Sequence, residues 1–100
     1  MLKGKTALVT GSTSGIGLGI AEKLAAQGAN VILNGFGDVE APKAAVLAAG
    51  QAFGIKVGYH GADMSKPAEI EALFAYAKAE FGGVDILVNN AGIQHVAKVE

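Results

Sequence analysis

The fold is decided by eight residues, Thr10-Gly11-Ser12-Thr13-Ser14-Gly15-Ile16-Gly17, which join two different sequence patterns. The apolar run at 5–10 that enters them is typical of a short buried strand. The run that leaves them carries Ile16, Ile20 and Leu24 at helical spacing, and Gly28 is placed to end the helix. We therefore expect a strand, a glycine-rich turn and a helix in succession.

This turn has the features of a phosphate cradle. Gly11, Gly15 and Gly17 permit backbone shapes, or a closeness of approach, that a side chain forbids, so a pyrophosphate can lie against main-chain N–H groups. A helix beginning near Gly15 directs unpaired N–H donors and roughly half a positive charge at such an anion. The hydroxyl groups at positions 12–14 are expected to add donors. A glycine turn can also be purely structural, so the turn alone leaves both interpretations open.

Length and composition limit the classes of protein to consider. One hundred residues predict a single domain over 1–100, and 51% hydrophobic with 17% charged residues excludes a disordered chain. Eight lysines against nine acids give a net charge of -1 without a basic cluster, so nucleic acid is not an expected partner. Cysteine is absent, and no His/Asp/Glu group has metal-ligand spacing, so no metal is expected.

No targeting or membrane pattern is recognisable in the sequence. The first residues lead directly into the strand pattern without a signal segment, and no apolar run approaches the roughly 20 residues that span a bilayer. We therefore expect a cytoplasmic protein with no membrane partner.

Strand and helix patterns alternate along the whole chain. Strands are predicted at 30–34, 56–60 and 84–88. Helices are predicted at 40–53 and over a segment that ends at 81. The helix at 40–53 could end earlier, at Gly50, because glycine is unfavourable within a helix. Such alternation predicts an α/β fold with an open, doubly wound parallel sheet. Ligands bind such sheets beyond the carboxyl ends of the strands, so the loops after the four strands should converge on one crevice.

The last predicted helix has the clearest periodicity. Its apolar stripe comprises Ile70, Leu73, Phe74, Ala77 and Phe81, with Ser65 as the expected N-cap and the glycines at 82–83 as the stop.

Two separated motifs resemble a known family. The motif at 10–17 and the run Asp85-Ile86-Leu87-Val88-Asn89-Asn90-Ala91-Gly92 are similar to the paired signatures of the short-chain dehydrogenase/reductase family, and the resemblance covers essentially the whole chain. It implies the first half, βαβαβαβ, of a Rossmann-type sheet. More narrowly, residues 11–21, 33–38 and 89–95 resemble bacterial D-3-hydroxybutyrate dehydrogenases. That likeness implies interconversion of D-3-hydroxybutyrate and acetoacetate, with a short hydroxy acid as substrate.

The resemblance also assigns residues to the cofactor. Asp63 and Met64 match positions that hold the adenine, Asn89 matches a position that braces the sheet, and Gln94 matches a contact to the substrate carboxylate. For Asp63, Asn89 and Asn90, local turn and loop hydrogen bonding is the alternative interpretation. The remaining matches to cofactor contacts are Gly11, Thr13, Ser14, Gly15, Ile16, Gly17, Asn90, Ala91 and Gly92.

The choice of cofactor follows from charge. An acidic side chain on the ribose hydroxyls favours NAD, whereas a 2′-phosphate needs a cation, and the chain contains no arginine. Asp38 follows Gly17 at close to the expected spacing, although Phe36 or the backbone around Gly35 is an alternative ribose contact. NAD is the predicted cofactor.

The catalytic groups of the family are not found in these residues. The family pairs a tyrosine with a lysine four positions on and adds a serine, and all three lie after position 100. The residues four positions after Tyr59 and Tyr76 are Asp63 and Glu80, so no catalytic residue is assigned within the chain. Both histidines are interpreted as solvated or packed residues.

The strand predicted at 84–88 would leave a flat apolar edge, which favours association. We therefore expect either the N-terminal part of a longer dehydrogenase or a half-domain that dimerises, and in both cases a homo-oligomer. The alternative function is that of a half-Rossmann fragment that binds a dinucleotide, or only self-associates, and catalyses nothing.

Overall fold

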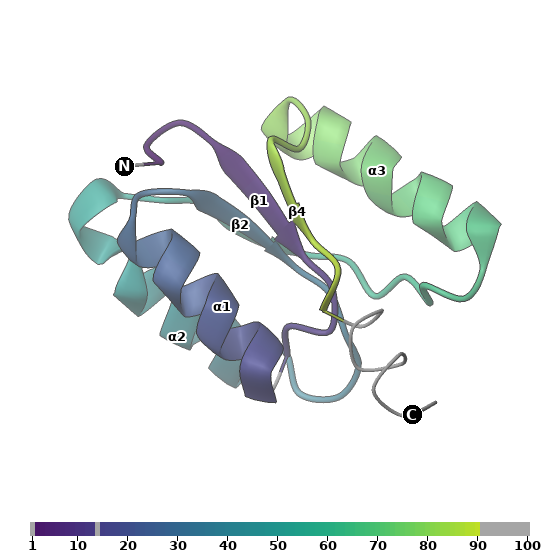
Figure 1. Ribbon diagram of the computed structural model, residues 1–100, viewed down its shortest axis with the longest axis horizontal. Helices are drawn as coiled ribbons and strands as arrows, with labels where there is room; N and C mark the ends of the chain where they lie inside the picture. Colours follow the sequence, from purple (N-terminus) through teal and green to yellow (C-terminus); the bar gives the residue numbers. More distant parts are fainter. Residues whose placement is uncertain (1, 14, 91–100) are drawn as a thin grey trace.

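The computed structural model describes residues 2–13 and 15–90 and has a sheet between two layers of helices (Figure 1). The elements in chain order are β1 (Thr6–Val9), α1 (Gly15–Ala26), β2 (Asn30–Leu33), α2 (Glu40–Ala49), the 3-10 helix η1 (Gln51–Phe53), β3 (Val57–Tyr59), α3 (Pro67–Phe81) and β4 (Ile86–Val88).

The four strands form one parallel sheet in the order β3-β2-β1-β4. In the register of the sheet, Leu8 of β1 lies between Ile32 of β2 and Leu87 of β4. Helix α1 connects β1 to its neighbour β2, and α2 connects β2 to its neighbour β3, whereas α3 carries the chain from β3 at one edge to β4 at the other. Each connection joins parallel strands through a helix, as a parallel sheet requires. The doubly wound parallel sheet predicted from the alternation is therefore confirmed.

Alternate residues of the central strands supply two cores. Val9, Val31 and Leu33 pack with α1 and α2 on one face, whereas Leu8 and Ile32 pack with α3 on the other. Figure 1 shows the same division, with α1 and α2 together on one side of the sheet and α3 on the opposite side. Burial on both faces explains why these strands are apolar throughout.

The packing face of α1 is made of small residues. Ile16 is 71% exposed, and the buried residues of the helix are Gly17, Ala21 and Ala25, one position further along. Small side chains let the helix axis approach the sheet closely, and this contact decides which face turns inward. Ile20 and Leu24 are partly buried and pack at the margin of this core.

The helix predicted at 40–53 ends early. Regular helix stops at Ala49, and Gly50 leads into η1. A Cβ on Gly50 would lie 2.4 Å from Ile55 Cδ1 and 2.9 Å from Ala25 O, so a larger residue here would require the neighbouring chain to shift.

The ends of α3 are partly as predicted. Gly82 ends the helix in a left-handed conformation with φ of 79°, as expected of a glycine stop. The N-cap is Lys66 and not Ser65, because the Ser65 hydroxyl donates instead to Asp63 Oδ1. Phe74 of the predicted stripe is exposed, whereas Leu73 and Ala77 are buried.

The strand β4 lies at the edge of the sheet, and its Leu87 is 54% exposed. Asp85 holds the start of this strand to β1, since its N–H donates to Thr6 O and its Oδ2 accepts the Thr6 N–H, each at 2.9 Å. An apolar edge was predicted here and is confirmed for the described part of the chain. Within that part, no helix combines the length and apolar character needed to cross a membrane.

Candidate dinucleotide-binding site

The loops that follow the strands meet at Asn34, the residue directly after β2. Its Oδ1 accepts the Gly11 N–H at 3.3 Å, and its Nδ2 donates to the backbone oxygens of His60 and Ala62, each at 3.0 Å. The side chain is buried, with 2% of the residue exposed. One carboxamide thus joins the loops after β1, β2 and β3, so these three loops lie together at one end of the sheet.

Ser12 completes this connection and is not a free donor. Its N–H and hydroxyl both point at Asn34 O, at 2.6 and 3.3 Å, and its Oγ accepts the Asn34 N–H at 2.9 Å. Because Ser12 is fully buried, its hydroxyl cannot reach a ligand outside the loop. The expectation that this hydroxyl contacts a phosphate was wrong.

The glycines of the first turn are required for two different reasons. Gly11 and Gly15 have φ of 62° and 61°, which L side chains rarely adopt. Gly17 instead lies against the turn, where a Cβ would be 2.1 Å from Gly11 O and 2.7 Å from Asn90 Nδ2. Asn90 is itself buried and donates to Gly11 O at 3.1 Å, so it ties the end of β4 to the same turn.

The turn presents the N-terminus of α1 to solvent. The N–H groups of Gly15, Ile16 and Gly17 lie in the first helical turn, where no intrahelical carbonyl is available to them. This turn carries no acidic side chain. The end of α1 is therefore electropositive and open, as an anion requires.

A groove of about 500 Å³ lies between this turn and the loop after β2. Phe36, 70% exposed, and Asp38 come from the loop after β2. The Asp38 Oδ1 also accepts the Glu40 N–H at 3.2 Å, which fixes the carboxylate at the start of α2. The residues that line the groove are Thr13, Gly15, Leu18, Phe36, Asp38, Ala41 and Pro42, and four of these were predicted to bind the cofactor.

Two contacts hold the loop after β2 against the glycine turn. The Thr13 hydroxyl donates to Phe36 O at 3.0 Å, and the Tyr59 hydroxyl donates to Gly35 O. Gly35 has φ of 153°, and a Cβ there would lie 2.5 Å from Thr13 Oγ1. The structure therefore leaves no room for a side chain at position 35. The acid that this loop supplies to the groove is Asp38.

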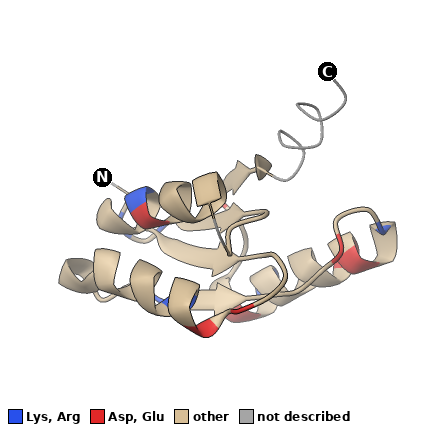
Figure 2. Cartoon of the chain, turned by 90° about the horizontal axis from the view of Figure 1, so that it is seen from below, with Lys and Arg blue, Asp and Glu red and all other residues tan. Residues whose placement is uncertain are grey.

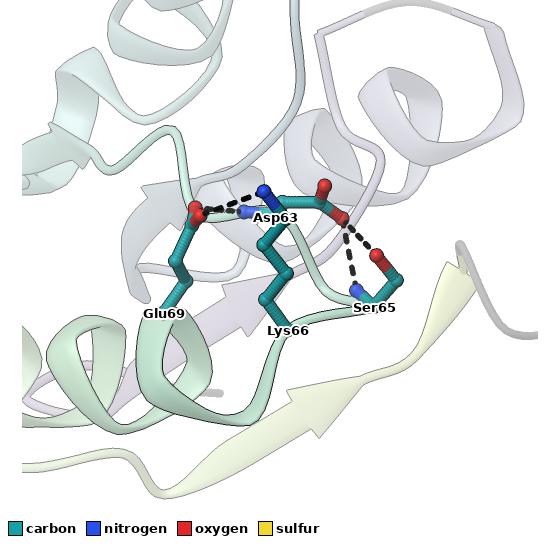
Figure 3. Close-up of polar contacts among 4 residues, drawn as sticks. All are labelled: Asp63, Ser65, Lys66 and Glu69. Carbon is teal, nitrogen blue, oxygen red and sulfur yellow. Dashed lines mark hydrogen bonds and ion pairs between the residues drawn. The ribbon is translucent and has the colours of Figure 1, made fainter.

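Asp63 and Met64 follow β3 and do not line the groove. Asp63 Oδ1 accepts the Ser65 hydroxyl at 2.7 Å and the Ser65 N–H at 2.9 Å (Figure 3). These two bonds, with a smaller contribution from the charge of Lys66, hold the pKa of Asp63 below its ordinary value although burial opposes the shift. Met64 packs on the core beneath α3.

Four residues predicted to bind the cofactor or the substrate lie outside the described residues: Ser14, Ala91, Gly92 and Gln94. Asn89 Oδ1 accepts the Thr10 hydroxyl at 3.3 Å, so it braces the ends of β1 and β4.

The aromatic side chains that could serve as acids or bases belong to the core. The Tyr76 ring packs against His60, with 5.4 Å between centroids, and against Phe81, with 6.2 Å. Among the described residues, no group of three or more His, Cys, Asp or Glu is arranged to hold a metal ion.

Sequence reasoning missed Asn34 and Tyr59 as parts of the site. Neither belongs to a recognisable short motif, because each acts on backbone groups far away in the sequence. A polar residue directly after an apolar strand was the available signal for Asn34, since this is where side chains reach the ligand edge of a parallel sheet.

A parallel sheet, a glycine turn that exposes a helix N-terminus and an adjoining acidic groove define a Rossmann-type nucleotide-binding fold. The sequence model of the short-chain dehydrogenases matches residues 5–100. The chain belongs to this family.

Related sequences narrow the resemblance. The D-beta-hydroxybutyrate dehydrogenase of Cupriavidus necator is 74% identical over 100 residues, which are 100% of this chain and 38% of that enzyme. The D-beta-hydroxybutyrate dehydrogenase of Rhizobium meliloti is 52% identical over 99 residues, 96% of this chain and 37% of that enzyme. The chain thus spans less than two fifths of the length of these relatives.

Solved structures share the fold. L-sorbose reductase from Gluconobacter frateurii, in complex with NADPH and L-sorbose, has a TM-score of 0.79 at 36% identity, over 89% of this chain and 34% of that one. An NADH-dependent reductase in complex with NAD has a TM-score of 0.73 at 41% identity, over 86% of this chain and 35% of that one.

Proposed function

We propose that the full-length protein is an NAD-dependent short-chain oxidoreductase that interconverts D-3-hydroxybutyrate and acetoacetate. This chain would supply the cofactor-binding half, residues 1–100. The observation that carries the proposal is the 74% identity to a D-beta-hydroxybutyrate dehydrogenase, which extends over every residue of the chain. The same chain is only 36% identical to the L-sorbose reductase that shares its fold, so its sequence is much more similar to the hydroxybutyrate enzyme.

The described residues fit a dinucleotide. The N–H groups at the start of α1 would bind the pyrophosphate, and Gly17 keeps that approach free of a side chain. The groove beside Phe36 and Asp38 would hold the adenosine ribose. Since the Asn90 side chain is committed to Gly11, a cofactor would meet Asn90 through its backbone. The other contacts proposed are Thr13, Ser14, Ile16, Asp63, Met64, Ala91 and Gly92, with Gln94 for the substrate carboxylate.

Charge in the groove favours NAD over NADP. The Asp38 carboxylate can accept hydrogen bonds from both ribose hydroxyls but repels a 2′-phosphate. The chain has no arginine to offset that repulsion. Figure 2 shows the lysines and acids of the described residues dispersed over the helices and loops, with no basic face among them.

Catalysis needs more than this half. The bound nicotinamide supplies the hydride acceptor or donor, and a separate group must move the proton of the substrate oxygen. Tyr59 is committed to Gly35 O, and neither tyrosine precedes a lysine by four positions. The proton-transfer residues would therefore come from the remainder of the full-length protein.

The test is the appearance of NADH absorbance when the full-length protein is mixed with NAD and D-3-hydroxybutyrate. NADP and L-3-hydroxybutyrate serve as matched controls. We expect turnover confined to NAD and the D-acid. Turnover of a sugar alcohol or steroid in place of the hydroxy acid would overturn the substrate assignment, and equal use of NADP would overturn the cofactor assignment.

For the isolated 100-residue chain, the absence of a tyrosine-lysine pair from its sequence favours dinucleotide binding without catalysis. Titration of that chain with NAD, followed by isothermal calorimetry, tests this second candidate. We further propose that the protein is cytoplasmic and a homo-oligomer, and sedimentation of the full-length protein measures its oligomeric state. For the isolated chain, the exposed edge of β4 favours self-association.

A further inference from the structure

The Glu69 side chain turns back from the first turn of α3 to the loop that precedes the helix (Figure 3). Its Oε1 accepts the Asp63 N–H, with 2.7 Å between the heavy atoms. A carboxylate acceptor makes this a charge-assisted hydrogen bond, which is shorter and stronger than a bond between neutral groups. Glu69 therefore fixes the backbone of Asp63.

The same loop is closed at its other end. The Lys66 N–H donates to Asp63 O at 3.0 Å, and Lys66 Nζ lies 3.9 Å from Glu69 Oε2. The ion pair is exposed and contributes little by itself. The two backbone contacts of Asp63 leave its peptide units little freedom to rotate.

The Asp63 side chain is fixed as well. Its Oδ1 accepts both the hydroxyl and the N–H of Ser65, whereas Oδ2 accepts no hydrogen bond from the described residues. One oxygen of the carboxylate thus orients the group, and the other keeps its acceptor capacity for a ligand.

We propose that Glu69 is a positioning residue that aims the Asp63 carboxylate at the amino group of the adenine. This inference rests on the proposed function, because it requires the adenine to bind at Asp63. An exocyclic amino group donates to a carboxylate, whereas hypoxanthine carries a carbonyl oxygen at that position and would face an acceptor with an acceptor. Correct placement of Oδ2 therefore determines selectivity for adenine.

A purely structural role for Glu69 has a different signature. An acid in the first turn of a helix stabilises the helix through its dipole. Loss of that effect alone would lower the melting temperature of the protein without changing which base it prefers.

The experiment compares kcat/KM of the full-length protein for NAD and for nicotinamide hypoxanthine dinucleotide. Four variants are measured beside the wild type: Glu69→Ala, Glu69→Gln, Asp63→Asn and Glu71→Ala. Glu71 is an exposed acid on the same helix and is the matched control. Glutamine at 69 retains an oxygen that can accept the Asp63 N–H.

We expect Glu69→Ala to reduce the preference for NAD about tenfold, mainly through KM, the scale of one hydrogen bond to a charged group. Glu69→Gln should restore most of the preference, and Glu71→Ala should leave it unchanged. An unchanged preference in Glu69→Ala, with Asp63→Asn still shifted toward hypoxanthine, would overturn the role of Glu69 alone. An unchanged preference in Asp63→Asn would instead overturn adenine binding at Asp63.

Discussion

Asn34 Oδ1 accepts the N–H of Gly11, so the end of β2 sets the position of the glycine turn that follows β1. Every polar atom of the carboxamide has a partner, because the two N–H groups of Nδ2 donate to His60 O and Ala62 O. A buried amide with every partner satisfied is rigid and costly to disturb. The glycine turn and the loop that carries Asp63 are therefore held by the same side chain.

Replacement of Asn34 by alanine should destabilise the protein by about 2–4 kcal/mol, because three buried backbone groups lose their partner. Urea unfolding of the full-length protein measures the change. Gln51→Ala removes an exposed amide and should change the free energy of unfolding by less than about 0.5 kcal/mol. Equal stability of Asn34→Ala and the wild type would contradict this account of the site.

The alternation of strands and helices was predictable because each buried strand is a short apolar run and each glycine stop is local. The role of Asn34 was not predictable in that way. Its side-chain partners lie 23, 26 and 28 positions away in the sequence. Only the fold brings them together, so no window of the sequence contains the arrangement.

The inner face of α1 was not predictable for a similar reason. The spacing of Ile16, Ile20 and Leu24 predicted a helix correctly but did not determine that Gly17, Ala21 and Ala25 are its buried residues. The structure turns Gly17 inward because the helix approaches Gly11 O closely, which leaves Ile16 exposed. The close approach of the α1 backbone to the glycine turn determines which face of α1 is buried. The hydrophobicity of the side chains does not predict this face.

Alanine substitutions at Gly17 and Gly19 of α1 distinguish the effect of this close approach from the effect of helix propensity. Gly17→Ala should weaken NAD binding at least about tenfold, because its Cβ would overlap Gly11 O and displace the turn. Gly19→Ala meets no atom within 4 Å and should stabilise the protein by about 0.5–1 kcal/mol, as alanine does within a helix. Fluorescence titration with NADH and thermal unfolding measure the two effects. Similar NADH affinities in the two variants would count against the proposed position of the pyrophosphate.

Asp38 should determine the preference for NAD over NADP. Asp38→Asn retains an oxygen for the Glu40 N–H and removes the negative charge from the groove. Relief of repulsion from a 2′-phosphate is worth about 1 kcal/mol near the surface, so kcat/KM for NADP should rise about fivefold relative to NAD. Glu22→Gln, a neutralised acid on α1 outside the groove, is the control. A rise of the same size in both variants would show a general effect of net charge and not a contact at Asp38.

Ser65 should determine how far Asp63 stays ionised in acid. Its hydroxyl is the largest cause of the lowered pKa of Asp63, so Ser65→Ala should raise that pKa, whereas Ser65→Thr should keep it low. Because the folded-state pKa lies below the unfolded value of about 3.9, ionised Asp63 adds stability above that pH. The contribution is lost as the pH falls through the folded-state pKa.

The alanine variant should therefore have less stability to lose in this range, and its free energy of unfolding should depend less steeply on pH below about 4. Carbon-detected NMR titration of the Asp63 carboxyl gives the pKa directly, and urea unfolding at several acidic pH values gives the stability. A pKa that does not move in Ser65→Ala would show that the hydroxyl is not needed, and that the N–H of residue 65 and the charge of Lys66 keep the carboxylate ionised. The N–H of residue 65 would then be the contact that orients the Asp63 carboxylate.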